Sequence, residues 1–481
     1  MPRRTKIVCT LGPAVDSEDM IRTLIRTGMN AARFNFSHGS HPEHLARLNM
    51  LKSVRDAMGR PVATILDTKG PEIRIKGFAA KSIELNAGDT FTLTTEDIVG
   101  DATRVSVTYS NLHQELAVGQ EILIDDGLVA IRVEEIVDRE IRCKVENGGN
   151  LSANKSINIP GVHIQLPALT EKDVADIRFG VENGFDFIAA SFVRQAADVE
   201  AVRRVLRDCG GSDVKIIAKI ENQEGVDNLE EILAAADGIM VARGDLGVEV
   251  PAYKVPILQK RMIQKCIAAG KPVITATQML DSMMRNPRPT RAEVSDVANA
   301  VFDGTSCVML SGETASGKYP IEALKAMVDI ATDAESSIHY WKRFKNRQFT
   351  PTTNQINDAI THTCCLTAMD LEAKAIVTMT ASGHTARMIS RYRPACPVAA
   401  LTVSEKIRRQ LAISWGVIPI LAGEPGSTDR IFSLSAEVAL KERLVDVGDT
   451  VVITAGIPFG KTGSTNLIKV QVMEEENLRS F

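Results

Sequence analysis

Lys219, Glu221 and Asp245 are charged residues whose types and spacing suit the binding of a metal ion beside an anion. The β-branched run that contains Lys219 predicts a strand, and residues two apart on a strand point to the same face, as Lys219 and Glu221 would. Asp245 follows the next predicted strand. Two carboxylates from neighbouring strand ends suit Mg²⁺, which keeps waters and a substrate oxygen in its shell. A purely structural Lys–Glu pair is the alternative.

Two earlier strand-like runs also end in polar residues. These residues are Arg33, Asn35 and Ser37, spaced two apart, and then Asp67 and Thr68. The period of two puts the first three on one face of a strand. Hard oxygen donors beside an arginine indicate a cation and an anion that are held together. The alternative is a loop of hydrogen-bonded caps. Farther along, Thr277 ends another predicted strand and is a candidate contact for a substrate.

Two other motifs fail on spacing. The segment GIPFGKT at 456–462 resembles a Walker A loop, but it has three residues between its glycines instead of four and leads into a predicted strand. His38, His41 and His44 are three apart, but Pro42 and a helix start break their shared face. The sequence therefore predicts neither an NTPase loop nor a zinc site.

The elements that must position these residues alternate between short strands and amphipathic helices. Three strands are expected before Gly70 and five after Thr170. Eight strands over a combined length near the roughly 250 residues of a (β/α)₈ barrel favour that fold, in which strand ends converge on one mouth. A doubly wound open sheet is the alternative.

The remaining segments predict two further domains. Residues 70–169 show alternating strands and no long helical period, which indicates an all-β lid domain inserted after the third strand. We expect the barrel to comprise residues 1–69 and 170–345. Residues 346–481 contain a second strand–helix series and predict a C-terminal open-sheet α/β regulatory domain.

Composition excludes several classes of protein. The chain has 481 residues, of which 44% are hydrophobic and 24% charged, and its 56 basic and 60 acidic residues give a net charge of −4. No basic stretch is interleaved with aromatic residues, so we expect no nucleic-acid partner. The longest run without charges, 156–170, is too short to span a membrane. Eight cysteines without a C-x-x-C pair and an N-terminus without a signal sequence favour a cytoplasmic protein.

Six segments together resemble the pyruvate kinase family, in family order and over essentially the whole chain. They are KIVCTLGP at 6–13, NFSHG at 35–39, DTKGPEIR at 67–74, KIEN at 219–222, ARGDLG at 242–247 and ATQML at 276–280. The resemblance implies a (β/α)₈ barrel with a mobile β lid and a regulatory C-terminal domain, usually in a homotetramer. It also implies a glycolytic reaction that moves the phosphoryl group of phosphoenolpyruvate to ADP and yields ATP and pyruvate.

The resemblance implies a role for each matching residue. Glu221 and Asp245 would bind Mg²⁺ or Mn²⁺, and Lys219 and Arg33 would neutralise the phosphoryl group, with Lys219 stabilising the transition state. The remaining assignments are Gly244, Asp245 and Thr277 for the pyruvate end, Asn35, Ser37, Asp67 and Thr68 for K⁺, Arg74 and Lys155 for the nucleotide phosphates, and Ser311 for a proton relay.

Two further expectations concern regulation. Thr68, Lys69 and Glu72 match the potassium-dependent members of the family, so we expect activation by K⁺. A loop between a strand and a helix resembles the sugar-phosphate effector site, with residues 460–465 closing over it. The loop residues are Thr380, Ser382, Gly383, His384 and Thr385. His384 stands where many activated relatives carry a lysine, which leaves open a sugar phosphate, a nucleotide or an inert loop.

Two rival functions remain from the residues alone. A lone lysine on a barrel strand could form a Schiff base, as in an aldolase. A scaffold on the same fold could bind effectors without catalysis. Glu221 and Asp245 beside a charged lysine argue against the aldolase, and the intact set of polar residues argues against the inactive scaffold.

Overall fold

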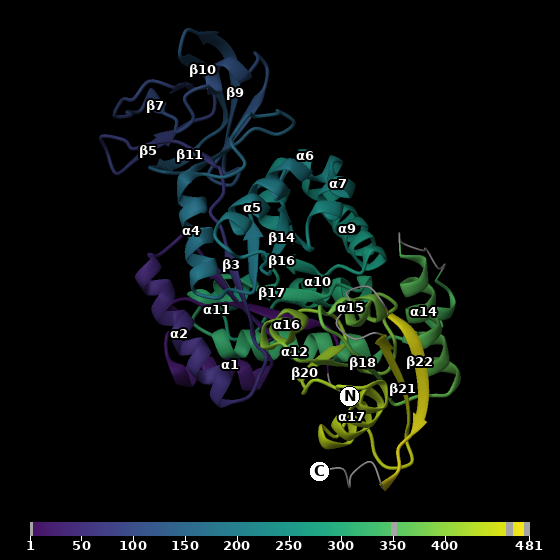
Figure 1. The fold of residues 1–481 in the computed structure, drawn as a ribbon. Coiled ribbons are helices and arrows are strands. Elements are labelled where there is room, and N and C mark those ends of the chain that lie inside the picture. The colour runs from purple at the N-terminus through teal and green to yellow at the C-terminus, as the bar shows by residue number, and fades with distance from the viewer. Residues whose placement is uncertain (1–2, 348–353, 458–464, 476–481) are drawn as a thin grey trace.

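The computed structural model describes residues 3–347, 354–457 and 465–475, which form three units (Figure 1). The central unit is a closed barrel of eight parallel strands in the order β1-β17-β16-β15-β14-β13-β3-β2. Its strands are β1 (Lys6–Thr10), β2 (Ala31–Asn35), β3 (Ala63–Asp67), β13 (Phe187–Ala190), β14 (Lys215–Ile220), β15 (Gly238–Ala242), β16 (Val273–Ala276) and β17 (Cys307–Leu310). The predicted (β/α)₈ barrel is confirmed, and the open-sheet alternative is wrong.

Helices cover the outside of the barrel. They are α1 (Glu18–Thr27), α2 (His41–Ala57), α4 (Glu171–Glu182), α5 (Ala196–Asp208), α6 (Gln223–Asp227), α7 (Leu229–Ala235), α8 (Arg243–Glu249), α9 (Val255–Ala269), α10 (Arg291–Asp303), α11 (Gly312–Ala315) and α12 (Pro320–Ser336). Capping boxes start three of them, at Ser40, Thr170 and Thr290, where the side chain accepts a backbone N–H and a carboxylate three residues later closes the box. These caps satisfy backbone N–H groups that the first turn of each helix leaves free.

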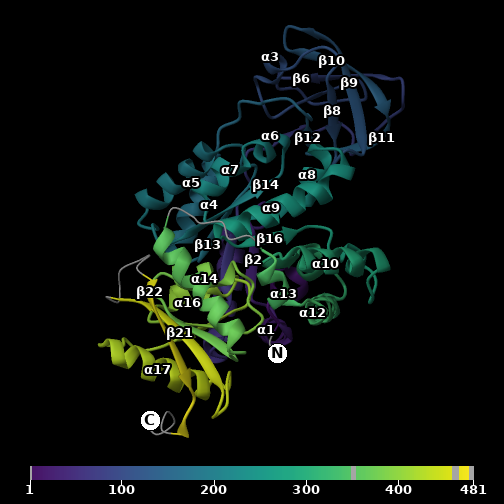
Figure 2. The same cartoon turned by 90° about the vertical axis from the view of Figure 1, so that its right-hand side faces the viewer.

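The β unit, which we call the lid, is inserted between β3 and α4. Its strands are β4 (Ile73–Arg74), β5 (Ser82–Leu85), β6 (Thr90–Thr94), β7 (Arg104–Ser106), β8 (Glu121–Ile124), β9 (Val129–Val137), β10 (Glu140–Asn147), β11 (Gly149–Ser152) and β12 (Ser156–Asn158), with helix α3 (Leu112–Glu115). Seven strands form one sheet, β4-β12-β8-β9-β10-β6-β7, and β11 pairs with β5. The lid stands above the barrel in both ribbon views (Figure 2).

The two chain segments that connect the barrel to the lid lie side by side. The N–H of Gly70, on the entering chain, donates to Asp173 Oδ1 at 2.9 Å, just after the chain returns. The guanidinium of Arg194 donates to the carbonyl oxygens of Ile164 and Leu166 at 2.9 and 2.7 Å. The barrel therefore holds both ends of the lid at one place.

The C-terminal unit is a five-stranded sheet that packs on the barrel at the end opposite the lid (Figure 1). Its elements are β18 (Ala375–Met379), β19 (Val398–Thr402), β20 (Val417–Leu421), β21 (Thr450–Gly456) and β22 (Thr465–Val472), with α13 (Tyr340–Lys345), α14 (Gln355–Asp370), α15 (His384–Ser390), α16 (Glu405–Leu411) and α17 (Thr428–Lys441). The strand order is β20-β19-β18-β21-β22, and only β22 runs antiparallel within this described sheet.

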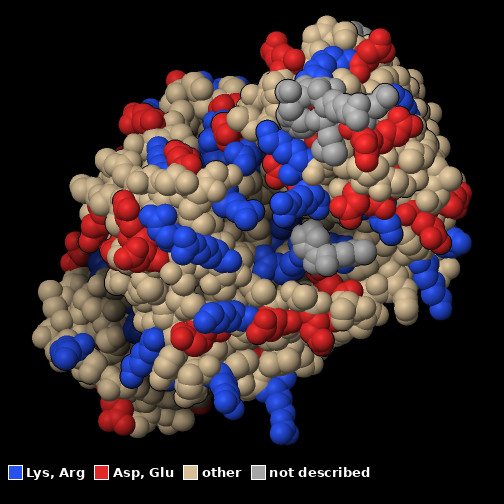
Figure 3. Space-filling model, turned by 90° about the horizontal axis from the view of Figure 1, so that it is seen from below, with Lys and Arg blue, Asp and Glu red and all other residues tan. Residues whose placement is uncertain are grey.

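The surface seen from below carries both signs of charge. Several Lys and Arg side chains gather around a hollow near its centre (Figure 3). Over the described residues, no helix is both long and apolar enough to cross a membrane.

Candidate active site at the barrel mouth

Lys219 and Glu221 lie together at the carboxyl end of β14. Lys219 Nζ is 2.9 Å from Glu221 Oε1, and both side chains are buried. The other carboxylate oxygen, Glu221 Oε2, accepts the backbone N–H of Phe192 at 2.6 Å. The predicted pair therefore exists, and its partners extend it into a larger network at the mouth.

Asp67, at the end of β3, joins two cations. Its Oδ2 accepts from Arg33 Nε at 2.6 Å, and its Oδ1 lies 3.1 Å from Lys219 Nζ. Burial alone would raise the pKa of Asp67, but Arg33 and Lys219 outweigh burial and hold the pKa below its ordinary value. The carboxylate is thus a fixed negative charge that aligns two positive side chains.

Lys219 keeps its proton for the same reason. Burial would lower the pKa of Lys219, but the neighbouring carboxylates of Asp67 and Glu221 raise it above its ordinary value. A permanently charged ammonium can neutralise an anion, whereas nucleophilic attack needs the neutral amine. The site therefore favours charge stabilisation over Schiff-base chemistry.

Ser191 is a contact of Lys219 that the sequence analysis missed. Its hydroxyl oxygen accepts from Lys219 Nζ at 2.6 Å and donates to the carbonyl of Thr68, also at 2.6 Å. Ser191 directly follows β13, so its position at a strand end was the available signal. The hydroxyl completes a set of three partners around the ammonium and fixes the direction of its N–H bonds.

Glu221 and Asp245 form an acidic pair. Burial raises the pKa of Glu221 to about 7. Lys219 opposes this rise, and the negative charge of Asp245 adds to it. Burial also raises the pKa of Asp245, whose carboxyl lies within hydrogen-bonding reach of Glu221. A buried and a partly buried carboxyl group this close together are stabilised by a cation between them. These residues therefore fit a divalent ion.

The acidic pair is not a complete metal site by itself. Within residues 3–347, 354–457 and 465–475, no group of three or more His, Cys, Asp or Glu side chains is arranged to hold a metal ion. A divalent ion would bind both carboxylates and complete its shell with water and substrate oxygens, which is the usual coordination of Mg²⁺ in phosphate enzymes.

Thr277 lies beside the start of α8. Its Oγ1 accepts the backbone N–H of Gly244 at 2.8 Å and donates to the carbonyl of Ala276 at 2.6 Å. Thr277 and Gln278 both have positive φ, 65° and 54°, which is strained for residues with side chains. The predicted partners Thr277 and Gly244 are therefore in contact, on a backbone whose conformation the surrounding bonds hold in place.

Ser311 lies at the end of β17, and its hydroxyl is buried without a hydrogen-bond partner among the described residues. Glu313, which the sequence analysis missed, accepts the N–H of Ser311 at 2.7 Å and the N–H of Leu280 at 3.0 Å. Burial raises the pKa of Glu313. A buried hydroxyl without a partner is expensive, so it fits a bound water or substrate.

The residues expected to bind K⁺ lie at the ends of β2 and β3. Asn35 and Asp67 are neighbours in the strand register. Asn35 Oδ1 accepts the N–H of Ser37 at 3.2 Å, and Ser37 is exposed. The Thr68 hydroxyl donates to Ala189 O at 3.3 Å and accepts from Ser191 N at 3.2 Å, and both partners are backbone groups. The oxygen donors suit a hard monovalent cation, and the cap-like bonds of the alternative are present as well.

Two family models match most of this chain. The family model "Pyruvate kinase, barrel domain" matches residues 2–324, and "Pyruvate kinase, alpha/beta domain" matches residues 358–471. The chain belongs to the pyruvate kinase family. A pyruvate kinase of Clostridium acetobutylicum is 52% identical over 473 residues, which cover 98% of this chain and 100% of the relative.

Other relatives agree. A pyruvate kinase of Geobacillus stearothermophilus is 51% identical over 477 residues, covering 99% of this chain and 81% of the relative. The crystal structure of a pyruvate kinase from Cryptosporidium parvum has a TM-score of 0.92 and 40% identity, and covers 98% of this chain and 96% of that one. The chain is accordingly a phosphotransferase, and the resemblance stated from the six motifs is confirmed.

In this pyruvate kinase family member, Arg74 and Lys155 are neighbours on the lid. They sit on β4 and beside β12, where Ile75 N donates to Lys155 O at 3.0 Å. Arg74 pairs with Glu72 at 2.7 Å, and Lys155 pairs with Asp125 at 2.8 Å. Both cations are about one-third exposed, so an incoming anion can reach them.

The lid also reaches the barrel mouth. Asp126, in a tight turn of the lid, and Glu72 are close enough to Asp245 to contribute to its raised pKa, after burial as the first cause. Asn158 Nδ2 donates to Glu249 Oε1 on α8 at 2.9 Å. The lid cations and the barrel carboxylates therefore border the same space.

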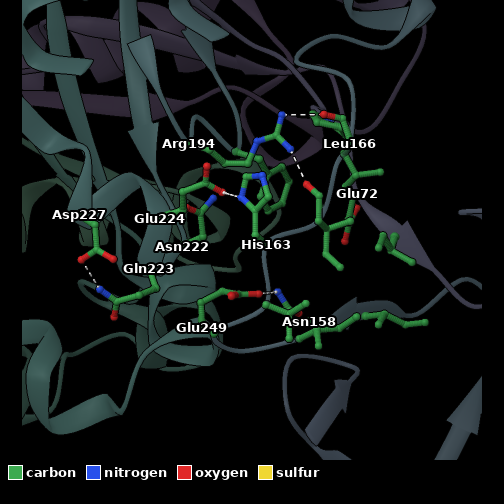
Figure 4. A pocket seen from close by; sticks show the side chains of 18 residues that line it. Glu72, Asn158, His163, Leu166, Arg194, Asn222, Gln223, Glu224, Asp227 and Glu249 are labelled. Carbon is green, nitrogen blue, oxygen red and sulfur yellow. Dashed lines mark hydrogen bonds and ion pairs between the residues drawn. The ribbon is translucent and has the colours of Figure 1, made fainter. Parts of the chain in front are cut away.

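A cavity of about 310 Å³ lies beside this mouth, between the base of the lid and α6. Figure 4 shows Arg194, His163 and Glu224 along one wall and Asn158 with Glu249 along another. The His163 ring lies 2.8 Å from Glu224 Oε2. The acidic pair of Glu221 and Asp245 does not line this cavity, which lies beside the catalytic cluster.

The predicted effector loop precedes α15. Thr380 Oγ1 accepts the N–H of Gly383, whose φ is 76°, at 2.9 Å. Thr385 Oγ1 lies 2.7 Å from Thr465 Oγ1. Burial, followed by Arg387, lowers the pKa of His384. Ser382 contributes its carbonyl to Arg387 at 3.2 Å. Of the closing segment, residues 460–464 lie outside the described residues, and Thr465 contacts the loop.

Proposed function

We propose that the barrel mouth transfers the phosphoryl group of phosphoenolpyruvate to ADP and releases ATP and pyruvate. The observation that carries this proposal is Lys219, a buried ammonium between Asp67 and Glu221 with its charge held by both. A loose phosphoryl transition state needs positioning and neutralisation more than covalent chemistry. Lys219 and Arg33 supply two fixed positive charges for that purpose.

Different groups at the mouth bind different ends of the substrate. Lys219 and Arg33 face the phosphoryl group, while Thr277 and the N-terminal turn of α8, with Gly244 and Asp245, hold the carboxylate end of the substrate. Mg²⁺ or Mn²⁺ bound by Glu221 and Asp245 supplies further positive charge to the phosphoryl oxygens. Each protein group is held by a hydrogen bond or ion pair before substrate arrives, which keeps the cost of reorganisation low.

The second half-reaction protonates the enolate that the transfer leaves. The Ser311 hydroxyl has no partner among the described residues and is the proposed relay group, with Thr277 on the facing loop. The nucleotide phosphates bind Arg74 and Lys155, which exchange their ion pairs with Glu72 and Asp125 for the ligand. Both cations are about one-third exposed, so the phosphates can reach them.

Pyruvate release tests the proposal. We expect pyruvate from phosphoenolpyruvate and ADP only when a divalent ion is present, and no product trapped by borohydride with a keto-acid, as an aldolase would give. Absence of pyruvate with every metal supplied would favour the inactive scaffold and contradict the proposal.

A K⁺ requirement is a second part of the proposal. Asn35, Ser37, Asp67 and Thr68 are the proposed ligands, and K⁺ supplies a further positive charge beside the phosphoryl group. The rate is measured with K⁺ replaced by an organic cation at constant ionic strength. We expect a large loss of rate, and an unchanged rate would reject the K⁺ site.

Regulation by a phosphorylated effector at Thr380, Ser382, Gly383, His384 and Thr385 is the third part. The buried hydroxyls of the loop support it, but α15 has only seven residues. A panel of sugar phosphates and AMP should shift the phosphoenolpyruvate saturation curve. A flat response would leave this loop without an effector. We also propose a domain division at residues 69, 169 and 345, a homotetramer and a cytoplasmic location, and sedimentation tests the tetramer.

A further inference from the structure

A separate cavity of about 290 Å³ lies at the base of the barrel, where the barrel meets the C-terminal domain. We call it the junction cavity. Its charged lining consists of Arg55, Asp56, Arg60, Glu405, Arg408 and Arg409. The first three come from the end of α2 and the loop before β3, and the other three come from α16. Two arginines and one carboxylate therefore come from each side of the domain boundary.

The arginines of the junction cavity are only partly satisfied by the protein. Arg55 is 5% exposed, and it donates through Nη1 to the carbonyl of Val62 at 3.1 Å and through Nε to Asp56 at a long 3.4 Å. Arg409 donates through Nε to Asp186 Oδ1 at 2.9 Å. Both guanidinium groups thus commit some N–H donors to the fold and keep others, since each carries five.

The other two arginines have more free capacity. Arg408 pairs with Glu405 at 3.1 Å and donates to Gly59 O at 2.7 Å, but its Nε is buried without a partner among the described residues. Arg60 is exposed, and no hydrogen bond or ion pair joins its side chain to any residue the structure describes. The unpaired buried Nε of Arg408 is costly, so it is arranged for a ligand that accepts hydrogen bonds, and the exposed guanidinium of Arg60 can donate to the same ligand.

Positive charge is crowded in the junction cavity, whose lining holds four arginines and two carboxylates. Burial, and then repulsion from the neighbouring Arg409, lowers the pKa of Arg55, while Asp186 and Asp56 act in the opposite direction. An anion in the cavity would relieve this repulsion and accept the remaining N–H donors. Arginine favours phosphate in particular, because its planar fork matches two phosphate oxygens.

We propose that the junction cavity binds a phosphate group, either as the free ion or as the monoester of a small polar molecule. The volume exceeds what one phosphate fills, which leaves room for a short organic body. The ligand would bond to arginines from both α2 and α16 and thereby tie the barrel to the C-terminal domain. This site is at the barrel base, away from the catalytic mouth, and it shares no residue with the loop at 380–385.

Calorimetric titration of the full-length chain with inorganic phosphate tests the proposal. Saturation with phosphoenolpyruvate and Mg²⁺, without ADP, occupies the mouth, and the ionic strength is held constant. We expect one phosphate per chain, with affinity about tenfold weaker or more in Arg60→Ala, because a hydrogen bond to a charged group is lost. Arg60 bonds to no other described side chain, so its removal should leave the fold intact.

Three further variants keep the result specific. Arg408→Gln should also weaken binding. Two controls should leave binding unchanged. Arg207→Ala removes an exposed arginine on α5, and Ser382→Asp places a negative charge in the loop at 380–385. Binding that survives Arg60→Ala and Arg408→Gln, or that Ser382→Asp abolishes, would overturn the junction site. A parallel titration with ribose 5-phosphate separates the two sources. If ribose 5-phosphate binds more tightly than inorganic phosphate, the ligand is a phosphate monoester. If the two bind equally, the ligand is the free ion. Both outcomes support the site.

Discussion

Two buried lysines on barrel strands, Lys219 at the mouth and Lys6 at the base, differ in the partners that surround them. Their exposed fractions are nearly the same, 8% and 7%. Lys219 lies between two carboxylates, which raise its pKa. Lys6 donates to the carbonyl of Val417 at 2.7 Å, and burial, followed by Arg3, lowers its pKa to about 8. Burial alone therefore does not decide the charge of a side chain in this barrel.

The difference separates chemistry from assembly. At the mouth, charged partners keep Lys219 as an ammonium that can meet a second anion. At the base, the Lys6 side chain joins β1 to the C-terminal domain through one backbone carbonyl, which stabilises a charge less than a carboxylate does. The mouth holds charge for a reaction, and the base uses the same residue type to connect two domains.

The sharpest test of this comparison is Lys219→Met. The change should slow phosphoryl transfer by roughly 10³ to 10⁵, by analogy with removal of a transition-state arginine. Lys6→Met is the matched control, since it removes an equally buried lysine from the other end and should leave the rate nearly unchanged. Steady-state pyruvate formation measures both. Similar rates in the two variants would mean that Lys219 is not the stabilising group.

Asp67→Asn should have the next largest effect. It removes the charge that holds Arg33 and Lys219, and breaking a buried ion pair leaves uncompensated charge at a cost of about 3–5 kcal/mol. Urea unfolding of the full chain should show a loss of this order, together with reduced activity. Asp16→Asn, which breaks an exposed pair with Arg47, is the control and should change stability by less than about 1 kcal/mol. Equal losses would contradict the structural importance of Asp67.

Lys6 should make stability depend on pH. Between pH 8 and about 10.5, the unfolded chain holds a proton on Lys6 that the folded chain has released. The free energy of unfolding should therefore rise with pH across this window, by on the order of 3 kcal/mol from this residue. Unfolding of the parent chain and of Lys6→Met at several pH values isolates the contribution. Parallel curves would show that Lys6 is not strongly perturbed.

Ser191→Ala should have the smallest effect of the four. Loss of one hydrogen bond to the Lys219 ammonium should lower kcat roughly tenfold and leave the KM for phosphoenolpyruvate nearly unchanged, because the lysine keeps its charge but loses its direction. Ser191→Cys, of similar size, should recover part of the rate. A change in KM alone would indicate that Ser191 acts in ground-state binding instead.

The sequence predicted the strand ends because period and order are local properties. Arg33, Asn35, Asp67, Lys219 and Asp245 could all be placed at one mouth from their positions after strands and from the closure of a barrel. The alternation at the end of β2 is confirmed as well, since Phe34 packs on Phe185 with ring centroids 5.2 Å apart, on the side away from the polar residues.

Contacts between distant segments could not be predicted in this way. Ser191 became important only because β13 lies next to β14, which brings its hydroxyl to Lys219. Glu313 joins the loops after β16 and β17, and no sequence pattern predicts a contact between these loops. The positive φ of Thr277 and Gln278 goes against the preference of both residue types, so only the surrounding fold explains it. Such strain is expected where function outweighs local preference.

Asp173, at the root of the lid, connects the two chain segments between which the lid is inserted. Asp173, fully buried, starts α4 by accepting the N–H and hydroxyl of Thr170 and also takes the N–H of Gly70. Asp173 thus ties residues 70 and 170 together directly, so this junction does not depend on the hundred or so residues between them. A chain in which a short turn replaces the whole insertion should still close its barrel, and the lid is in this sense a removable module.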